Sequence, residues 1–179
     1  MKSVGVFLAS TIPNFDVEED IKLFSKFVLE NNLRVVYGGG KFGLMGKLYD
    51  QIRVVDQRIS GITLDMFNKI GATPSNLEGV EIKGDFFSRK KALMDDSDFF
   101  FVFPGGIGTA DELFDVLNHV SLGIENKNIY LFNKDGCWDG LLQWISKTVE
   151  LGMIKDIPKR FYVESELPKL IERIRLNEF

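Results

Sequence analysis

The sequence DFFFVFPGGIGTADE, residues 98–112, joins a strand signal to a helix signal through a glycine-rich loop. The aromatic run 99–103 has the length and composition of a buried strand, and it ends at Pro104-Gly105-Gly106, which cannot continue a strand comfortably. Such a loop directs backbone N–H groups and the positive end of a helix dipole outward, which favours a phosphate ligand. A helix is predicted from Thr109 to residue 122, because apolar residues follow at helical spacing: Leu113, Val116, Leu117 and Val120.

Length and composition indicate an ordinary globular protein. The 179 residues are expected to form a single domain, 1–179, with 45% hydrophobic and 27% charged residues. The net charge of −4 argues against nucleic acid or an anionic membrane as the main partner. The apolar run at the N-terminus is too short for a signal peptide or a membrane span, so a cytoplasmic protein is expected.

Two residue types that build many metal and redox sites are nearly absent. The single cysteine, Cys137, excludes an intrachain disulfide and fits a reducing compartment. The single histidine, His119, excludes multi-histidine metal sites. The sequence therefore predicts neither a metal nor a cofactor.

Strand and helix signals alternate along the whole chain. This alternation predicts right-handed βαβ units and an α/β fold, with a doubly wound, mostly parallel sheet and helices on both faces (Rossmann-like). Strands are expected at 3–9, 33–37, 58–64, 80–82, 98–103, 128–132 and, as an edge strand, 158–163. Helices are expected at 16–32, 43–55, 85–95, 109–122, 139–151 and 166–176, with a loop at 65–79.

Two glycine loops follow predicted strands, at 38–43 and 104–109. Ligands bind at the carboxyl ends of the strands in such sheets, so both loops are expected to converge on one site. The first loop, GGGKFG, formally matches the dinucleotide fingerprint G-x-G-x-x-G, but it follows the second strand and lacks an acidic residue about 20 positions on. A tight turn with glycines for close packing is an equally good interpretation of that motif alone.

The carboxylate of Glu112 has two interpretations. Residues 109–112 have the T-x-x-E form of a capping box, and in isolation this structural role, worth about 1 kcal/mol, is the favoured one. The functional interpretation is a carboxylate that faces the crevice beside the phosphate loop, with Asp115 adding negative charge nearby. Arg89-Lys90-Lys91, on the preceding helix, are either a solvated face or the source of a cation over the ligand.

Several of these elements together resemble the Lonely Guy family, the cytokinin riboside 5′-monophosphate phosphoribohydrolases, whose members have often been labelled lysine decarboxylases. The family signature PGGxGTxxE is present at residues 104–112. An Arg-Lys pair on the preceding helix matches Arg89-Lys90, and a glycine loop ending in GLMG matches residues 37–46. Segment 131–138 also resembles the family's strand and turn before its late helix, and the resemblance spans residues 4–154.

The resemblance implies hydrolysis of the N-glycosidic bond of adenosine 5′-monophosphate, or of its N6-substituted (cytokinin) forms, to the free base and ribose 5-phosphate. It implies a small nucleotide as partner, a homodimer with sites near the interface, and Arg89 and Glu112 as the catalytic pair. Breaking a ribosyl bond builds positive charge that a fixed carboxylate stabilises, and Arg89 is expected to keep Glu112 ionised. The implied substrate-binding residues are Gly39, Gly40, Gly43, Met45, Lys90, Gly105, Gly106, Gly108, Thr109, Asp115 and Asn118.

Some positions depart from the family pattern. Phe86 and Phe87 stand where many members have Met-His, and Asn118 stands where threonine is common, so the base pocket is expected to be reshaped. Two other functions stay open, a non-catalytic nucleotide-binding or cofactor-carrier protein and a pyridoxal-phosphate decarboxylase. The chain is short for decarboxylase chemistry, and no sequence motif identifies a lysine that would form a Schiff base with pyridoxal phosphate.

Overall fold

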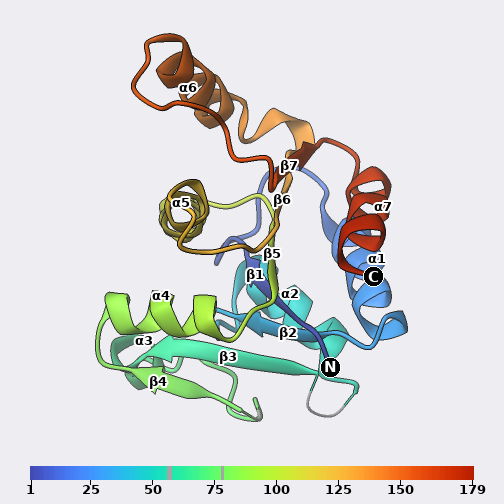
Figure 1. Cartoon of the computed structure of the whole chain (residues 1–179). Coiled ribbons are helices and arrows are strands. Elements are labelled where there is room, and N and C mark those ends of the chain that lie inside the picture. Colours follow the sequence, from blue (N-terminus) through green and yellow to red (C-terminus); the bar gives the residue numbers. More distant parts are fainter. Residues whose placement is uncertain (56–57, 78) are drawn as a thin grey trace.

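The computed structural model describes residues 1–55, 58–77 and 79–179, and its centre is a parallel sheet (Figure 1). The described strands pair in the order β4-β3-β2-β1-β5-β6-β7, and every pairing is parallel. The order reverses between β1 and β5, which confirms the doubly wound fold and puts the switch point at the carboxyl ends of these strands. The strands are β1 (Ser3–Phe7), β2 (Arg34–Tyr37), β3 (Ile59–Leu64), β4 (Glu81–Lys83), β5 (Phe99–Val102), β6 (Ile129–Phe132) and β7 (Phe161–Glu164).

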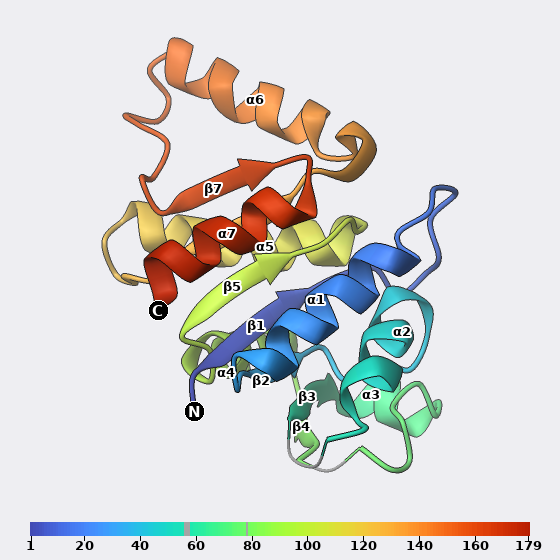
Figure 2. The ribbon, with the colours of Figure 1, turned by 90° about the vertical axis from the view of Figure 1, so that its right-hand side faces the viewer.

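Helices cover both faces of the sheet (Figure 1, Figure 2). Helices α1, α2 and α7 supply apolar side chains to one core cluster, and α4, α5 and α6 supply them to a second cluster. None of the described helices is both long and apolar enough to cross a membrane. The α-helices are α1 (Glu18–Glu30), α2 (Gly43–Ile52), α3 (Asp65–Lys69), α4 (Phe86–Asp95), α5 (Ile107–Ser121), α6 (Asp139–Glu150) and α7 (Leu167–Glu178), and a short 3-10 helix, η1 (Lys134–Gly136), follows β6.

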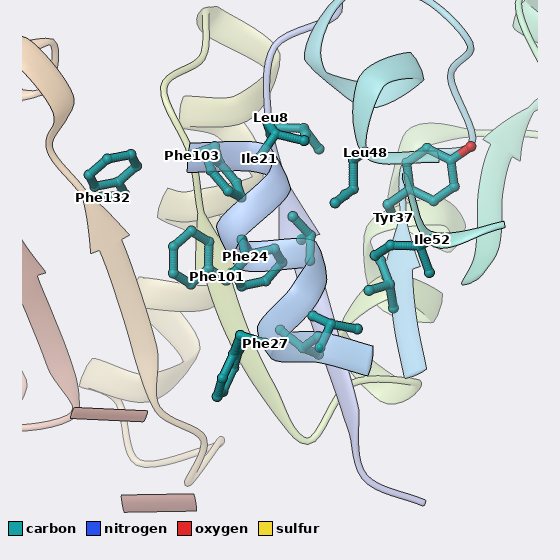
Figure 3. Packing of buried hydrophobic residues seen from close by; sticks show 14 of the residues in the cluster. Leu8, Ile21, Phe24, Phe27, Tyr37, Leu48, Ile52, Phe101, Phe103 and Phe132 are labelled. Carbon is teal, nitrogen blue, oxygen red and sulfur yellow. The ribbon is translucent and has the colours of Figure 1, made fainter. Parts of the chain in front are cut away.

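Strand β5 is apolar at every position because it faces two cores. Phe99 and Phe101 belong to the cluster with α1, whereas Phe100 and Val102 belong to the cluster with α5. Phe24 of α1 packs on Phe101, with ring centroids 4.3 Å apart (Figure 3). The glycine loop after β5 therefore starts from a strand that is fixed on both faces.

The segment after β3 differs from the sequence prediction, because it contains the short helix α3 where a loop is predicted. Gly71, one of the residues that favours a loop, has a φ of 68° and lies just past the end of this helix. Its N–H bonds to the carbonyl of Asn68, and the N–H of Ala72 bonds to that of Phe67, which is the Schellman pattern. The glycine is thus a helix stop signal; position 78 of the predicted loop lies outside the described residues.

Candidate functional site

A pocket of about 600 Å³ lies at the carboxyl ends of the strands, and both glycine loops line it. Gly38 and Gly40 come from the loop after β2, Gly106 comes from the loop after β5, and Gly108 lies in the first turn of α5 that follows it. The predicted convergence of the two loops is therefore confirmed. The remaining lining side chains come from the ends of β1 and β3 and from helices α2 to α5.

Arg89 is held by two neighbouring elements of the pocket. The residue is 8% exposed, and its Nε donates to the carbonyl of Ile62 in β3 at 2.9 Å. Its Nη1 donates to Oε1 of Glu112 on α5, also at 2.9 Å. The guanidinium therefore bridges β3 and α5, and its third nitrogen, Nη2, lies beside Gly38.

The helix that carries Glu112 begins before the predicted residue. Gly106 is the N-cap of α5, Ile107 is its first residue, and no side chain caps it. Thr109 thus lies inside the first turn, and its side chain packs on Gly105 so closely that a Cβ there would have no room. The capping-box prediction is wrong because its threonine is not the N-cap, and the Glu112 carboxylate pairs with Arg89 instead.

Burial is the dominant influence on the charge of Glu112. It raises the pKa of this carboxyl above its ordinary value of 4.5, because a buried carboxylate loses hydration. The Arg89 charge and its hydrogen bond lower the pKa, but they do not outweigh burial. Arg89 therefore favours the ionised form of Glu112, as expected, while burial sets the direction of the net pKa shift. A carboxyl with a raised pKa is suited to accept and release a proton, as catalytic acids and bases do.

The N-terminus of α5 is open toward the pocket. Three successive N–H groups, of Ile107, Gly108 and Thr109, have no acceptor among the described residues. The first bonded N–H of the helix is that of Ala110, which donates to the carbonyl of Gly106. The Ile107 residue is 91% exposed, and a Cβ on Gly108 would meet open space. Together with the helix dipole, these free donors form an anion-binding end.

At the N-terminus of α2, by contrast, N–H groups of the first turn already have an acceptor within the protein. The carbonyl of Ala9 accepts from the N–H of Leu44 at 3.1 Å and from the N–H of Met45 at 3.3 Å. Gly43 has a φ of 61° and packs against the backbone of Ser10 with no room for a Cβ. The first glycine loop therefore has the close packing that the tight-turn interpretation of its motif describes.

The structure separates the predicted site residues into two groups. Lys90 lies outside the pocket lining, with Nζ 3.0 Å from the carboxylate of Asp111 and 3.9 Å from that of Asp115. Asn118 lies in a groove between α5 and α6, beside Trp144. The predicted residues that line the pocket are Arg89, Glu112, Gly40, Met45, Gly106, Gly108 and Thr109; Gly39, Gly43, Lys90, Gly105, Asp115 and Asn118 do not line it.

Sequence reasoning missed several lining residues. Ser10 and Thr11 follow β1, and their place at the carboxyl end of a strand at the switch point is the signal that identifies them. Phe67 lies on α3 and has no such signal. Of the two phenylalanines that depart from the family pattern, Phe86 lines the pocket, whereas Phe87 is 84% exposed and does not. Within the described ranges, no three His, Cys, Asp or Glu side chains are grouped as a metal site.

Known proteins similar to this chain match it over nearly its whole length. The family described as "Possible lysine decarboxylase" matches residues 45–172. The Arabidopsis thaliana "Probable cytokinin riboside 5'-monophosphate phosphoribohydrolase LOG6" is 31% identical, over 99% of this chain and 89% of that protein. The Arabidopsis thaliana "Cytokinin riboside 5'-monophosphate phosphoribohydrolase LOG7" is also 31% identical, over 99% of this chain and 82% of that protein.

Solved structures share the fold. The X-ray structure of TM1055 superposes with a TM-score of 0.72 at 21% identity, covering 98% of this chain and 99% of that one. The molybdenum cofactor carrier protein from Chlamydomonas reinhardtii superposes with a TM-score of 0.66 at 15% identity, covering 98% and 96%. At these identities the similarity shows the fold alone.

Proposed function

The chain belongs to the Lonely Guy family of cytokinin riboside 5′-monophosphate phosphoribohydrolases, and we propose that it hydrolyses the N-glycosidic bond of adenosine 5′-monophosphate or of its N6-substituted forms. The products are the free base and ribose 5-phosphate. The observation that carries this proposal is the largely buried Arg89–Glu112 pair, which lines a pocket beside an open helix N-terminus. Hydrolysis of a nucleotide needs both features, an anion site for the phosphate and a fixed carboxylate for the sugar.

The N-terminus of α5 is proposed to bind the 5′-phosphate. Its free N–H groups, from Ile107 to Thr109, and its dipole both favour a phosphate, whereas at the N-terminus of α2 the N–H groups of Leu44 and Met45 are already bonded to the carbonyl of Ala9. Glu112 lies about one turn further along α5, and a turn rises about 5.4 Å. That spacing suits a ribose ring between the phosphate and the bond that breaks.

Glu112 is proposed to act on the sugar and on water. In the reaction the bond from C1′ to the base nitrogen breaks, a water oxygen bonds to C1′, and the base gains one proton overall. A carboxylate beside the ring stabilises the positive charge that develops on the sugar more than it stabilises the neutral ground state. The raised pKa of Glu112 suits it to take the proton that the attacking water gives up.

Arg89 is proposed to orient Glu112 and to contact the substrate. Its Nε and Nη1 are already engaged with Ile62 and Glu112, so Nη2, beside Gly38, is the nitrogen left for a substrate oxygen. A pocket that only binds nucleotides would gain little from this arrangement, because a buried ion pair often stabilises a fold no better than apolar residues do. The pair therefore favours catalysis over the carrier alternative.

The test is to incubate the purified protein with adenosine 5′-monophosphate and with N6-isopentenyladenosine 5′-monophosphate, and to quantify free base and ribose 5-phosphate. Glu112→Gln is expected to lower base release by about 100-fold or more, while nucleotide binding measured by calorimetry persists. Glu172→Gln, which changes an exposed carboxylate on α7, is the matched control and leaves release unchanged. Nucleotide binding without any base release from the unmodified protein would support a carrier instead.

A homodimer is also part of the proposal, as the family resemblance implies. The groove between α5 and α6 carries the exposed apolar side chains of Leu122, Trp144 and Met153, which is typical of an interaction surface. Light scattering during size-exclusion chromatography is expected to give twice the 20.3 kDa of one chain. The mass of a single chain would contradict the dimer.

A further inference from the structure

The pocket is apolar wherever α2, α3 and the start of α4 line it. The polar lining side chains come from the β1 and β3 ends, from α5, and from Arg89. The apolar part contains no strong hydrogen-bonding side chain, so it accepts a ligand group through contact area. Its members are Phe42, Met45, Phe67, Ile70, Ala72 and Phe86.

Phe67 and Phe86 form an aromatic pair in this apolar part. Their ring centroids lie 6.4 Å apart with an angle of 83° between the planes, an edge-to-face contact. The carbonyl of Phe67 accepts from the N–H of Ala72 at 2.9 Å, and the carbonyl of Ala72 accepts from the N–H of Lys41 at 2.9 Å. These two backbone bonds tie α3, and with it the aromatic pair, to the first glycine loop.

Phe86 also has a fixed relation to the Arg89 side chain. The two residues are three positions apart on α4, so they share one helix face, and both line the pocket. The first turn of α4 is held by Asp85, whose carboxylate accepts from the N–H of Ser88 at 2.9 Å. If the sugar of a ligand contacts Arg89, the group attached to that sugar therefore lies near Phe86.

We infer that Phe67 and Phe86 form a stacking subsite for the base of the nucleotide. This inference rests on the proposed function, which assigns the phosphate to α5 and the sugar to Arg89 and Glu112. The base is the part of the substrate that then meets the apolar residues. Phe86 is half-exposed, so its ring is available to a base in the pocket.

At an apolar subsite of this kind, affinity depends more on the apolar area that a base buries than on its hydrogen-bond pattern. A purine with an apolar N6 substituent buries more surface than adenine does, so it is the preferred class of substrate. A hydrophobic pocket rejects an isostere with an altered polar group by only about 100-fold, whereas a hydrogen-bonding site reaches about 10⁴. The kcat/KM values for adenosine and inosine 5′-monophosphates are therefore expected to differ by less than about 100-fold.

The experiment compares Phe86→Ala with Phe87→Ala, because Phe87 is the neighbouring residue and lies outside the pocket lining. In Phe86→Ala the Kd of adenosine 5′-monophosphate is expected to rise about tenfold or more, the usual effect of losing one stacked ring. The Kd of ribose 5-phosphate, which has no base, stays the same, and Phe87→Ala changes neither value. Phe86→Leu keeps apolar volume without a ring and is expected to fall between these two variants.

Unchanged nucleotide affinity in Phe86→Ala would overturn the inference. An equal loss of affinity for ribose 5-phosphate would also overturn it, because it would indicate damage to the whole pocket. Both affinities are measured in the Glu112→Gln background, where hydrolysis of the nucleotide is suppressed, so they are independent of base release. If the unmodified protein binds the nucleotide but releases no base, the proposed function fails while the two affinities still decide the subsite. Absence of nucleotide binding would overturn both.

Discussion

Gly38 and Arg89 are in contact because residue 38 has no side chain: a Cβ on Gly38 would lie 2.5 Å from Nη2 of Arg89. The guanidinium has little freedom to move away, since its other nitrogens are bonded to Ile62 and Glu112. We predict that Gly38→Ala displaces the guanidinium and lowers kcat for base release by about 100-fold, the usual effect of a misplacement near 1 Å. Steady-state kinetics measures the loss, and circular dichroism checks that the fold persists.

Gly140→Ala is the matched control for this variant. Gly140 lies in α6, and a Cβ there would meet open space. Activity is expected to stay unchanged, and the free energy of unfolding to rise by about 0.5 kcal/mol, because alanine favours the helix. Full activity in Gly38→Ala would contradict the need for this contact.

The pH dependence of base release follows from the raised pKa of Glu112. The carboxyl must be ionised to accept a proton from water, so kcat/KM falls as the pH decreases through this pKa. Because burial raises the pKa, the fall is expected at a pH above the ordinary 4.5. A pH profile of kcat/KM measures this, and a fall centred at 4.5 would contradict the burial argument.

The same shift makes a prediction for stability. The folded protein holds the Glu112 proton more tightly than the unfolded chain does, because the folded-state pKa is raised above 4.5. The Glu112 contribution to stability is therefore lost as the pH rises from 4.5 through the folded-state pKa. Urea midpoints of the unmodified protein, measured relative to those of Glu112→Gln, are expected to decline over this interval. A constant difference between the two proteins would show that the pKa is not shifted.

Lys90 is predicted to position α4 against α5 without contacting the substrate. Its Nζ is 3.0 Å from Asp111 and 3.9 Å from Asp115, and the residue lies outside the pocket lining. Lys90→Met is expected to lower the free energy of unfolding by about 1 kcal/mol, since the ion pairs are partly exposed. The KM for nucleotide stays within about threefold, a change of less than 1 kcal/mol. A much larger rise in KM would restore the substrate-binding role that the family resemblance implies.

The fold was predictable from sequence because the spacing of the apolar residues distinguishes the strands from the longer helices. Strand β5 reads as one continuous apolar run, since both of its faces are buried. Helix α3 gave no such signal, because five residues are too few to show an amphipathic period. Its stop residue, Gly71, also suits a loop, and only the backbone bonds that surround it decide between the two.

The two glycine loops of the candidate site were predictable from sequence, but the partners of its charged side chains were not. Arg89 and Lys90 are adjacent basic residues on one helix, and adjacent residues point about 100° apart, so sequence alone does not say which one faces the pocket. The T-x-x-E pattern suits a capping box as well as it suits a carboxylate directed at a partner. The start of α5 at Ile107 decides this, and that start depends on how the loop after β5 packs.

The last turn of α7 is anchored to the amino ends of β1 and β6 through Glu178. Its side chain is 5% exposed and accepts hydrogen bonds from Lys2 (2.6 Å), Asn128 (2.7 Å) and the Tyr130 hydroxyl (3.0 Å). We predict that Glu178→Gln lowers the free energy of unfolding by about 2 kcal/mol, because charge-assisted bonds are lost in a buried place. Glu172→Gln, exposed on the same helix, is the control and changes it by less than about 0.5 kcal/mol. Urea denaturation compares the two variants, and equal midpoints would contradict the anchor. Base release is expected to persist, since the pocket lies at the opposite ends of the strands.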